Sequence, residues 1–486
     1  MSFVTRGRQR LGQRLGQRRA AANDAQHGAE RRPRTFAALE FRNFRLFWWG
    51  QVVSVTGTFM QSTAQQWLVL TLAPTDPLAL GITGALQFGP SLVLGPFAGV
   101  IVDRYPRRAI LYATQISQGI LAAALWLLTT AHVVQLWHVY LLALLLGLVT
   151  AIDNPTRQAF VSEMVPTSHL LNAISLNSVQ FNVARIIGPA VAGAMIAILG
   201  IPLMFLLNAV SFIAVLVGLW LMRASDLYLT PRDPNRASGL RAVSEGARFI
   251  WANHDIRITF LLITVVGTLG FNFNVLLPLL ATTVLHAGPA EFGMLTSSLG
   301  VGALAGALLL ARRGGKPTHL ILAGTAALFG LLEALAGQTG SLVLTLILIA
   351  ATGAMMSTFS ASANTTVQLS APAEMRGRVM SVYTMIFIGS TPIGNLTVSA
   401  IAAGLGTPIS FLFTGLPCIA AAGMTSWLWR RERRATAATA EVDDTAQVVL
   451  TAMAGTRLST GVVPESPPSV SGIRSIPPGV RRDHAE

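Results

Sequence analysis

The sequence predicts an all-α membrane protein whose twelve transmembrane helices form two pseudo-symmetric six-helix bundles. Two observations predict this class. Hydrophobic residues make up 52% of the 486 residues and charged residues 12%, about half the charged share of soluble domains. The apolar residues also gather into runs of about 20 or more, the length at which a helix crosses the hydrocarbon core of a membrane. A soluble multidomain protein, which length alone would suggest, is therefore excluded.

The apolar runs define the expected spans, and the charges between them define their orientation. The runs lie at residues 46–72, 78–102, 109–131, 136–156, 170–199, 201–223, 258–284, 291–311, 318–338, 341–364, 377–404 and 408–429. Every second gap between the runs carries arginine or lysine, and the other gaps carry none. Short basic loops stay on the cytoplasmic side of a membrane. Since the number of spans is even, we expect both termini in the cytoplasm of a multi-pass protein of the cell (inner) membrane.

The longest internal polar stretch divides the chain into two halves. We expect a disordered basic cytoplasmic arm (1–43), an N-terminal six-helix bundle (44–224), a cytoplasmic linker (225–256), a C-terminal six-helix bundle (257–430) and a disordered cytoplasmic tail (431–486). Within the linker, residues 244–251 can form a short interfacial helix. The halves also share a spacing, because Pro166 and Pro372 each precede a serine by nine residues and a glycine by 22. Such a repeat is typical of two bundles around a central path.

The net charge of +14 does not indicate nucleic-acid binding, because the arginines concentrate at the N-terminal arm, after the last apolar run and in alternate loops. Membrane orientation and attraction to anionic lipid require that distribution. The sequence holds no phosphate-binding glycine loop and no His/Cys cluster with metal-ligand spacing. We therefore expect no enzyme, no cofactor and no metal. The energy for any transport must then come from an ion gradient or from the gradient of the substrate.

The loop after the second run carries a candidate gate. Its sequence pattern is G-x-x-x-D-R-x-x-R-R, formed by Gly99, Asp103, Arg104, Arg107 and Arg108. The pattern resembles the loop between the second and third spans of major facilitator superfamily transporters, and the resemblance implies a role in gating. Asp103 could accept hydrogen bonds from backbone N–H groups at a helix start. The arginines could pair with acids of a neighbouring bundle and so hold the cytoplasmic side in one conformation.

Other stretches narrow the resemblance. They are similar to the twelve-span branch of the superfamily that includes the enterobactin exporter and the macrolide and tetracycline efflux proteins. These stretches are residues 44–51, residues 67–69, the loop around Asp103, Asn154-Pro155-x-Arg157-Gln158-Ala159 and Arg376-Gly377-Arg378-Val379-x-Ser381. The resemblance covers residues 36 to 430 and implies proton-coupled efflux. Asp153 and Arg157, four residues apart, form either a local cytoplasmic ion pair or a second latch. Many relatives carry an acid after Gly57, where this chain has Thr58, so proton coupling would fall to another acid.

Polar residues in the first span are candidates for the substrate site. Thr58, Gln61 and Gln65 are spaced i, i+3 and i+7 and so share one helix face. Buried amides in a span require a partner or water. We expect this face to line a central cavity, with hydrogen bonding between helices as the alternative.

The fifth span combines a cation with a proline-glycine motif. Ser178, Asn182, Arg185 and Pro189 fall on one face. Arg185 cannot lose its proton at useful pH, so it could hold an anionic substrate, tune a nearby carboxylate, or extend to the cytoplasmic surface from a position near the helix end. Residues 184–193 resemble the antiporter signature G-x-x-x-G-P-x-x-G-G, which implies that Gly188, Pro189 and Gly193 supply a hinge or seal a leak.

The second half holds one acid within its apolar body, Glu333. Desolvation disfavours a charged carboxylate, which would allow Glu333 to exchange a proton. Arg185 could take part in the proton coupling by tuning a nearby carboxylate. Alternatively, Glu333 lies at the outer end of its span in interfacial water. Further candidates for the cavity lining are Asn272, Asn274, Asn364, Ser390 and Asn395.

Taken together, these residues predict a proton-coupled secondary exporter of amphipathic small molecules such as drugs, siderophore-like compounds or other secondary metabolites. Its expected partners are this cargo, protons and membrane lipid, and we expect a monomer. A mostly uncharged polar lining suits bulky amphipathic cargo. Two alternatives stay open: an importer or uniporter with the same fold, and a membrane scaffold or sensor that transports nothing.

Overall fold

The computed structural model describes residues 35–74, 76–228, 239–314 and 317–431. Over these residues the chain consists of helices joined by short turns and contains no strand. The expected disordered arm and tail fall almost wholly outside the described residues. The described residues up to Trp427 form one compact unit, which holds every helix discussed below apart from the last turn of the final one.

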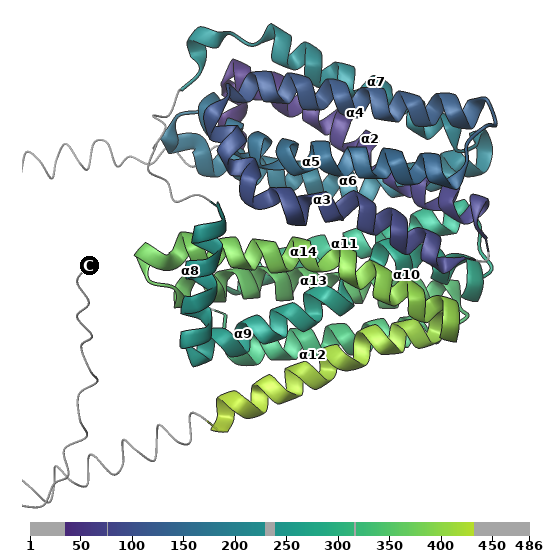
Figure 1. The fold of residues 1–486 in the computed structure, drawn as a ribbon, viewed down its shortest axis with the longest axis vertical. Coiled ribbons are helices and arrows are strands. Elements are labelled where there is room, and N and C mark those ends of the chain that lie inside the picture. Colours follow the sequence, from purple (N-terminus) through teal and green to yellow (C-terminus); the bar gives the residue numbers. More distant parts are fainter. Residues whose placement is uncertain (1–34, 75, 229–238, 315–316, 432–486) are drawn as a thin grey trace, which may run out of the picture. The chain divides into compact units, whose positions relative to one another are not determined.

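The first half consists of six long helices that pack with one another (Figure 1): α2 (Arg42–Leu72), α3 (Pro77–Arg104), α4 (Arg107–Thr130), α5 (Leu136–Met164), α6 (Leu170–Leu199) and α7 (Pro202–Leu221). In the second half, α8 (Gly239–Ala252) precedes a seventh span composed of α9 (His254–Val265), the π-helix η4 (Val266–Gly270), α10 (Phe273–Leu279) and the π-helix η5 (Leu280–Val284). The remaining spans are α11 (Pro289–Arg313), α12 (His319–Ala336), α13 (Leu342–Ser370), α14 (Ala373–Leu405) and the helix Thr407–Arg431. Three short 3-10 helices, Ala37–Glu40, Thr167–His169 and Ala224–Asp226, lie in the turns of the first half.

Eleven helical segments of the described chain are long and apolar enough to cross a membrane. The expected twelfth span is α2, whose 31 residues exceed the length that a membrane requires. It is more polar than the other spans because it carries glutamines at positions 51, 61, 65 and 66. Each membrane-spanning helix agrees with an expected apolar run, and several extend past it.

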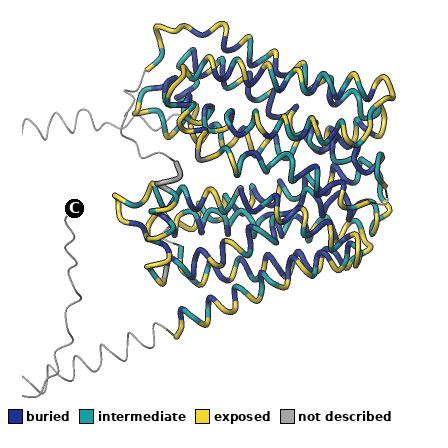
Figure 2. The backbone as a smooth tube through the Cα atoms, viewed as in Figure 1, coloured by how far each residue is buried: buried dark blue, intermediate teal, exposed yellow. Residues whose placement is uncertain are grey.

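The outer surface of the helices is apolar, as a lipid solvent requires. Large hydrophobic side chains such as Trp220, Leu320 and Val343 are about 70% exposed. Figure 2 shows the exposed residues recurring along each helix beside buried ones, which is the pattern of helices that pack on one side and face solvent on the other. The chain therefore folds with lipid, and not water, covering these faces.

Corresponding ends of the two halves are built in the same way. Gly200 after α6 and Gly406 after α14 both take a left-handed backbone conformation, with φ of 83° and 87°. Each glycine precedes a proline by two residues, and glycine with proline just beyond a helix is a common helix stop. The two halves thus repeat a structural corner as well as a sequence spacing.

The seventh span is interrupted near its middle. Asn272 leaves the helical conformation between η4 and α10, with φ of −101° and ψ of 35°. Its side-chain Nδ2 donates to the carbonyl oxygens of Thr268 and Leu269 at 2.7 and 2.8 Å. Backbone groups that lose their helical hydrogen bonds inside a membrane must find other partners within the protein. The side chain of Asn272 is that partner for two carbonyl groups just before the break.

The two halves contact each other mainly along two helix pairs, α3 with α14 and α6 with α11, and α10 adds smaller contacts with α2 and α3. Glycines permit the close approach in both pairs: Gly81 lies against Ser399 and the Asn395 carbonyl, and Gly193 lies against Gly293. The α3–α14 contact extends as far as Leu92, which meets Gly389. Farther along α3, Gly95 and Gly99 have open space beside them, although α8 also contacts α3. Accordingly, Val93 and Val100 are more than half exposed.

The helix expected over residues 244–251 is present as the longer α8. It packs on α14, where Gly246 approaches the backbone carbonyl of Arg378. Glu245 and Arg378 form an ion pair at 3.0 Å. The linker between the halves is therefore fastened to the second half at this point.

Candidate functional site

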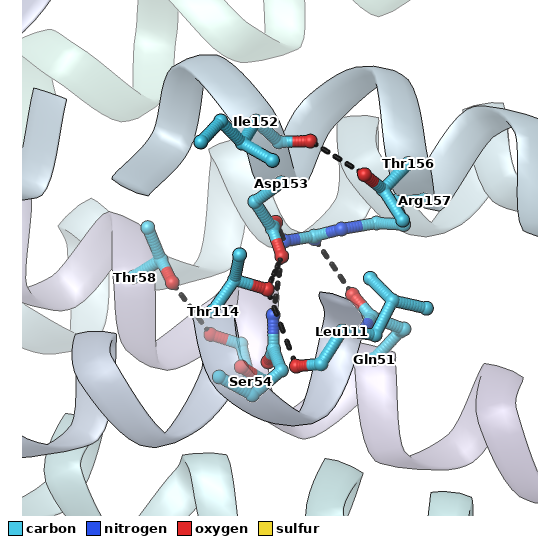
Figure 3. Close-up of polar contacts among 10 residues, drawn as sticks. Gln51, Ser54, Thr58, Leu111, Thr114, Ile152, Asp153, Thr156 and Arg157 are labelled. Carbon is cyan, nitrogen blue, oxygen red and sulfur yellow. Dashed lines mark hydrogen bonds and ion pairs between the residues drawn. The ribbon is translucent and has the colours of Figure 1, made fainter. Parts of the chain in front are cut away.

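A buried polar network joins α2, α4 and α5 (Figure 3). Its centre is Asp153, whose side chain is only 1% exposed. The carboxylate accepts hydrogen bonds from Thr114 Oγ1 at 2.6 Å and Gln115 Nε2 at 2.9 Å, and it forms an ion pair with Arg157. Arg157 Nη1 in turn donates to Gln51 Oε1 at 2.7 Å. The local Asp153–Arg157 ion pair expected from the spacing is thus present. It lies inside the bundle, where its hydrogen bonds connect three helices.

Two arginines of the candidate gate loop, Arg107 and Arg108, bind partners within their own half. Arg107 Nη1 lies 2.9 Å from Glu163 Oε1 at the end of α5. Arg108 Nη2 donates to the Leu219 carbonyl at 2.6 Å, close to the C-terminal end of α7, where a cation is favourable. The expected pairing of these two arginines with acids of the other bundle is absent from this conformation.

Asp103 lies in the last turn of α3, and α4 begins only at Arg107. We expected its carboxylate at a helix start; instead it stands at a helix C-terminus, where backbone carbonyls and not N–H groups point outward. Among the described residues the Asp103 carboxylate makes no hydrogen bond or ion pair. Gly99, one turn earlier, has open space on its side-chain face.

The three polar residues of the first span, Thr58, Gln61 and Gln65, lie in different surroundings. Gln61 is buried and accepts a 2.7 Å hydrogen bond from Asn208 Nδ2 of α7, so the helix–helix alternative is correct for this residue. Thr58 is exposed and donates to the carbonyl of Ser54 in its own helix. Only Gln65 lines a cavity, where its Nε2 lies 3.5 Å from Gln87 Oε1.

That cavity lies between α2, α3 and α10, and so between the two halves. Its polar lining comprises Ser62, Gln65, Gln66, Thr83, Gln87 and Asn274. Gln66 Nε2 donates to Asn274 Oδ1 at 3.2 Å, which links the halves across the cavity. Of these residues, the sequence pattern identified Gln65 and Asn274. Gln66 and Gln87 were missed, although an amide in an apolar run was the signal available for both.

Arg185 lies in the middle of α6, so an extended side chain reaching the surface from the helix end is ruled out. Its Nη2 donates to Asn182 Oδ1 at 3.2 Å, and its Nε is buried without a hydrogen-bond partner. Ser178, on the same face, is exposed. The three residues thus share a face as the spacing predicted.

The proline-glycine motif of α6 forms contacts with both halves. A side chain at Gly188 would meet Phe59 of α2, whereas one at Gly193 would meet Pro289 and Gly293 of α11. Pro189 lies within the helix, and its carbonyl faces Gly293. Small residues here permit close packing of α6 with α11, which favours the sealing role over an open hinge.

Glu333 is completely buried in α12, so the expectation that it lies in interfacial water is wrong. Neither carboxylate oxygen has a hydrogen-bond partner of good geometry within the described chain. Thr414 and Cys418 of the helix Thr407–Arg431 lie beside it. The helix packing that buries Glu333 depends on the close approach of Gly330 and Gly415.

The remaining amide candidates lie inside the second half. Asn272 closes the break in the seventh span and packs on Gly394, so it serves the helix and does not line the cavity. Asn395 is buried against Gly84, with both its side-chain polar atoms unpartnered among the described residues. Asn364 accepts from Gln368 at 2.6 Å. Over the described residues no group of three or more His, Cys, Asp or Glu side chains gathers into a metal site.

Known proteins are similar to this chain in sequence and in fold. A sequence profile described as transmembrane secretion effector matches residues 34–458. The staphyloferrin A transporter of Staphylococcus aureus is 29% identical over 374 residues, which cover 75% of this chain and 90% of that protein. The multidrug efflux pump Tap of Mycolicibacterium fortuitum is 27% identical over 381 residues, covering 75% and 90%. The crystal structure of a POT family transporter in complex with a thioalcohol-conjugated peptide superimposes with a TM-score of 0.64 at 13% identity, covering 80% of this chain and 96% of that one.

The profile spans most of the chain, the helices repeat in two halves, and the superimposed structure has the same fold. The chain belongs to the transmembrane secretion effector family, a branch of the major facilitator superfamily of membrane transporters.

Proposed function

We propose that the protein is a proton-coupled secondary exporter of amphipathic small molecules, such as drugs, siderophore-like compounds or other secondary metabolites. It works as a monomer by alternating access of two six-helix bundles, residues 44–224 and 257–430. One observation carries the proposal: α3 and α14 pack closely near the Pro77 end of α3, whereas open space lies beside Gly95 and Gly99 toward its Arg104 end. One-sided contact of this kind is the arrangement from which a rocking motion can open the other side.

The charges orient this arrangement in the membrane. The loop at the Arg104 end of α3 carries three arginines, whereas the turn at the Pro77 end carries none. Basic loops favour the cytoplasm, so the side with the open space faces the cell interior and both termini lie there. An exporter binds its cargo from that side, which makes this conformation the loading state.

We assign gating to Gly99 and Asp103, which lie toward the Arg104 end of α3. Closure of the cytoplasmic half brings Gly99 and Asp103 toward the second bundle, where Asp103 gains the partners that it lacks here. Arg107 and Arg108 hold the loop to α5 and α7 meanwhile. Asp153 and Arg157 keep α2, α4 and α5 together, so that the first half moves as one body.

Coupling is assigned to Glu333. A charged carboxylate without partners is costly in a membrane interior, so the buried state described here holds a protonated carboxyl. Release of this proton requires α12 and the helix Thr407–Arg431 to separate or to admit water. Export then gains its energy from the proton gradient.

The cargo class is supported by the relatives and by the cavity. The matched proteins are named for staphyloferrin A and for multidrug efflux, and a macrolide efflux protein of Streptococcus pyogenes is also 24% identical over 387 residues. The cavity between the halves is lined by amides, hydroxyls and the apolar side chains of Leu80 and Phe88, without a charged group. Such a lining suits molecules that carry several hydrogen-bonding groups on an apolar frame.

The test is vesicle transport with an imposed proton gradient. Inverted and right-side-out vesicles containing the protein are given one cationic, one neutral and one anionic fluorescent amphipath. We expect gradient-dependent accumulation of at least one probe in inverted vesicles only, abolished by a protonophore. Accumulation confined to right-side-out vesicles would establish an importer, and transport that ignores the protonophore would remove the coupling.

A further inference from the structure

We propose that Arg185 forms an anion-binding subsite on the transport path, so that the cargo carries a carboxylate or another anionic group beside its apolar body. This inference rests on the proposed function and specifies the charge of its substrate.

Arg185 differs from three other arginines of the first half, Arg107, Arg108 and Arg157, in what its guanidinium contacts. Arg107 pairs with Glu163, Arg157 pairs with Asp153, and Arg108 binds backbone carbonyls at the end of α7. Arg185 has one amide oxygen, that of Asn182, and no acidic partner within the described residues.

A guanidinium carries five N–H donors and a permanent charge. In the middle of a membrane span, such a charge is costly unless it is paired or faces a water-filled cavity. Within the described residues the guanidinium of Arg185 makes one hydrogen bond, to Asn182, so most of this donor set is unused. Its buried Nε has no partner, which is also true of Arg108 and Arg157. Carboxylate and phosphate oxygens match the guanidinium fork with two parallel hydrogen bonds, which makes an anion its best ligand.

The contacts on either side of Arg185 define the direction in which it lies. Phe181 and Gly188 face α2, because the rings of Phe181 and Phe59 are 5.3 Å apart and a side chain at Gly188 would meet Phe59. Ile186 faces α11, since its carbonyl accepts a 2.7 Å hydrogen bond from Ser297. At 100° per residue, Arg185 falls between these two directions and faces the seam between α2 and α11. One of those helices comes from each half.

The approach to this seam is open and amphipathic. A long side chain on a helix leans toward the N-terminus, and for Arg185 that direction leads to Asn182 and Ser178. Ser178, Val179 and Phe181 are all exposed, the last two at 54% and 50%. A molecule entering along α6 from the Leu170 end therefore meets hydroxyl, amide, cation and aromatic surfaces in succession.

The experiment measures the potential at this position without requiring a known substrate. Cys418 is the only cysteine of the chain and is buried, so the natural protein is the unreactive control. Ser178→Cys is introduced, and the protein is placed in nanodiscs of uncharged lipid so that no lipid headgroup supplies the anion. The rates of modification by an anionic sulfonate and by a cationic trimethylammonium methanethiosulfonate are then compared.

We expect the anionic reagent to be favoured, and this preference to fall about tenfold when Arg185→Gln is added, as a single charge at about 7 Å in partly screened water would produce. Arg185→Lys should retain most of the preference. A thiol that reacts with neither reagent, or a preference that survives Arg185→Gln, would overturn the anion site.

A second arm tests cargo. A panel of aromatic and alkyl carboxylates, each with its primary amide, is tested for protection of the same thiol. Protection by carboxylates that exceeds protection by their amides at least tenfold in concentration, and that disappears with Arg185→Gln, supports the proposal, whereas equal protection or none contradicts it. A vesicle assay without transport would remove the exporter and leave the labelling result standing, so the two failures are distinguishable.

Discussion

Gly193 of α6 and Gly293 of α11 lie directly against each other: a side chain on Gly193 would stand 2.8 Å from the Gly293 Cα and 2.5 Å from the Pro289 carbonyl oxygen. The converse also holds, because a side chain on Gly293 would meet the Pro189 carbonyl at 2.5 Å. Two backbones from different halves therefore touch at the point where the proline-glycine motif crosses its partner. Trp67 of α2 stacks on Phe292 of α11 next to this contact, with ring centroids 5.8 Å apart.

Adding a methyl group to this contact should open it. We expect Gly193→Ala to destabilise the closed contact by about 1–3 kcal/mol, the usual cost of overpacking. The population should shift away from the described conformation, toward one with α6 and α11 apart. Distance measurements between spin labels on the two helices detect the shift. Gly324→Ala, a helical glycine with open space beside it, is the matched control, and equal behaviour of the two variants would contradict the sealing role.

Replacing the buried carboxyl by its neutral analogue should uncouple transport from protons. Glu333→Gln keeps the shape of a protonated glutamate, so the fold should be retained while export driven by a pH gradient falls at least tenfold. Exchange of labelled for unlabelled cargo, which needs no net proton movement, should continue. Glu291→Gln is the control, because Glu291 caps the start of α11 through a 2.9 Å hydrogen bond that glutamine can also make. Full gradient-driven export by Glu333→Gln would show that another group carries the proton.

The Asp153 network should behave as a structural unit. Asp153→Asn removes the counter-ion of a largely buried arginine, and breaking such a pair costs about 3 kcal/mol. Adding Arg157→Gln should restore part of the loss, because the uncompensated charge then disappears. Thermal unfolding in detergent of the two single variants and the double variant measures this coupling. If the single variants unfold at the temperature of the natural protein, the network contributes nothing to the fold.

Two glutamines of the same helix should respond differently. Gln61 binds Asn208, so Gln61→Ala and Asn208→Ala should each lower the free energy of unfolding by about 1 kcal/mol and leave the KM for cargo unchanged. Gln65 lines the cavity between the halves, so Gln65→Ala should raise KM severalfold with a smaller loss of stability. The comparison is made by vesicle transport and thermal unfolding of all three variants. A KM that rises for Gln61→Ala and not for Gln65→Ala would reverse the assignment.

The fold could be predicted because span length and charge alternation are strong, local signals. The ends were less predictable, as α5 shows: charges at Asp153 and Arg157 suggested that the span stops near residue 156, whereas the helix continues to Met164. The two charges neutralise each other inside the bundle, so they do not end the helix. Glu163 was missed because it falls in the gap between the runs 136–156 and 170–199, and its pairing with Arg107 depends on how α4 and α5 pack.

The site could be predicted only in part, since helical spacing identifies a face but not what the face meets. Thr58, Gln61 and Gln65 share a face by spacing, yet they meet solvent, α7 and α3 respectively. For two amides of α2 the neighbour comes from a segment more than 100 residues away, since Gln61 meets Asn208 and Gln66 meets Asn274.

The glutamines of α2 have a consequence for biogenesis. The protein-conducting channel releases a segment into lipid according to its apolarity, and α2 is the one long helix of the described first half that falls below the apolarity of a span. The amide of Gln61 is satisfied by Asn208 of α7, which is synthesised 147 residues later. We therefore expect the first segment to linger at the channel until its later partner emerges, so that the first half enters the bilayer as a group.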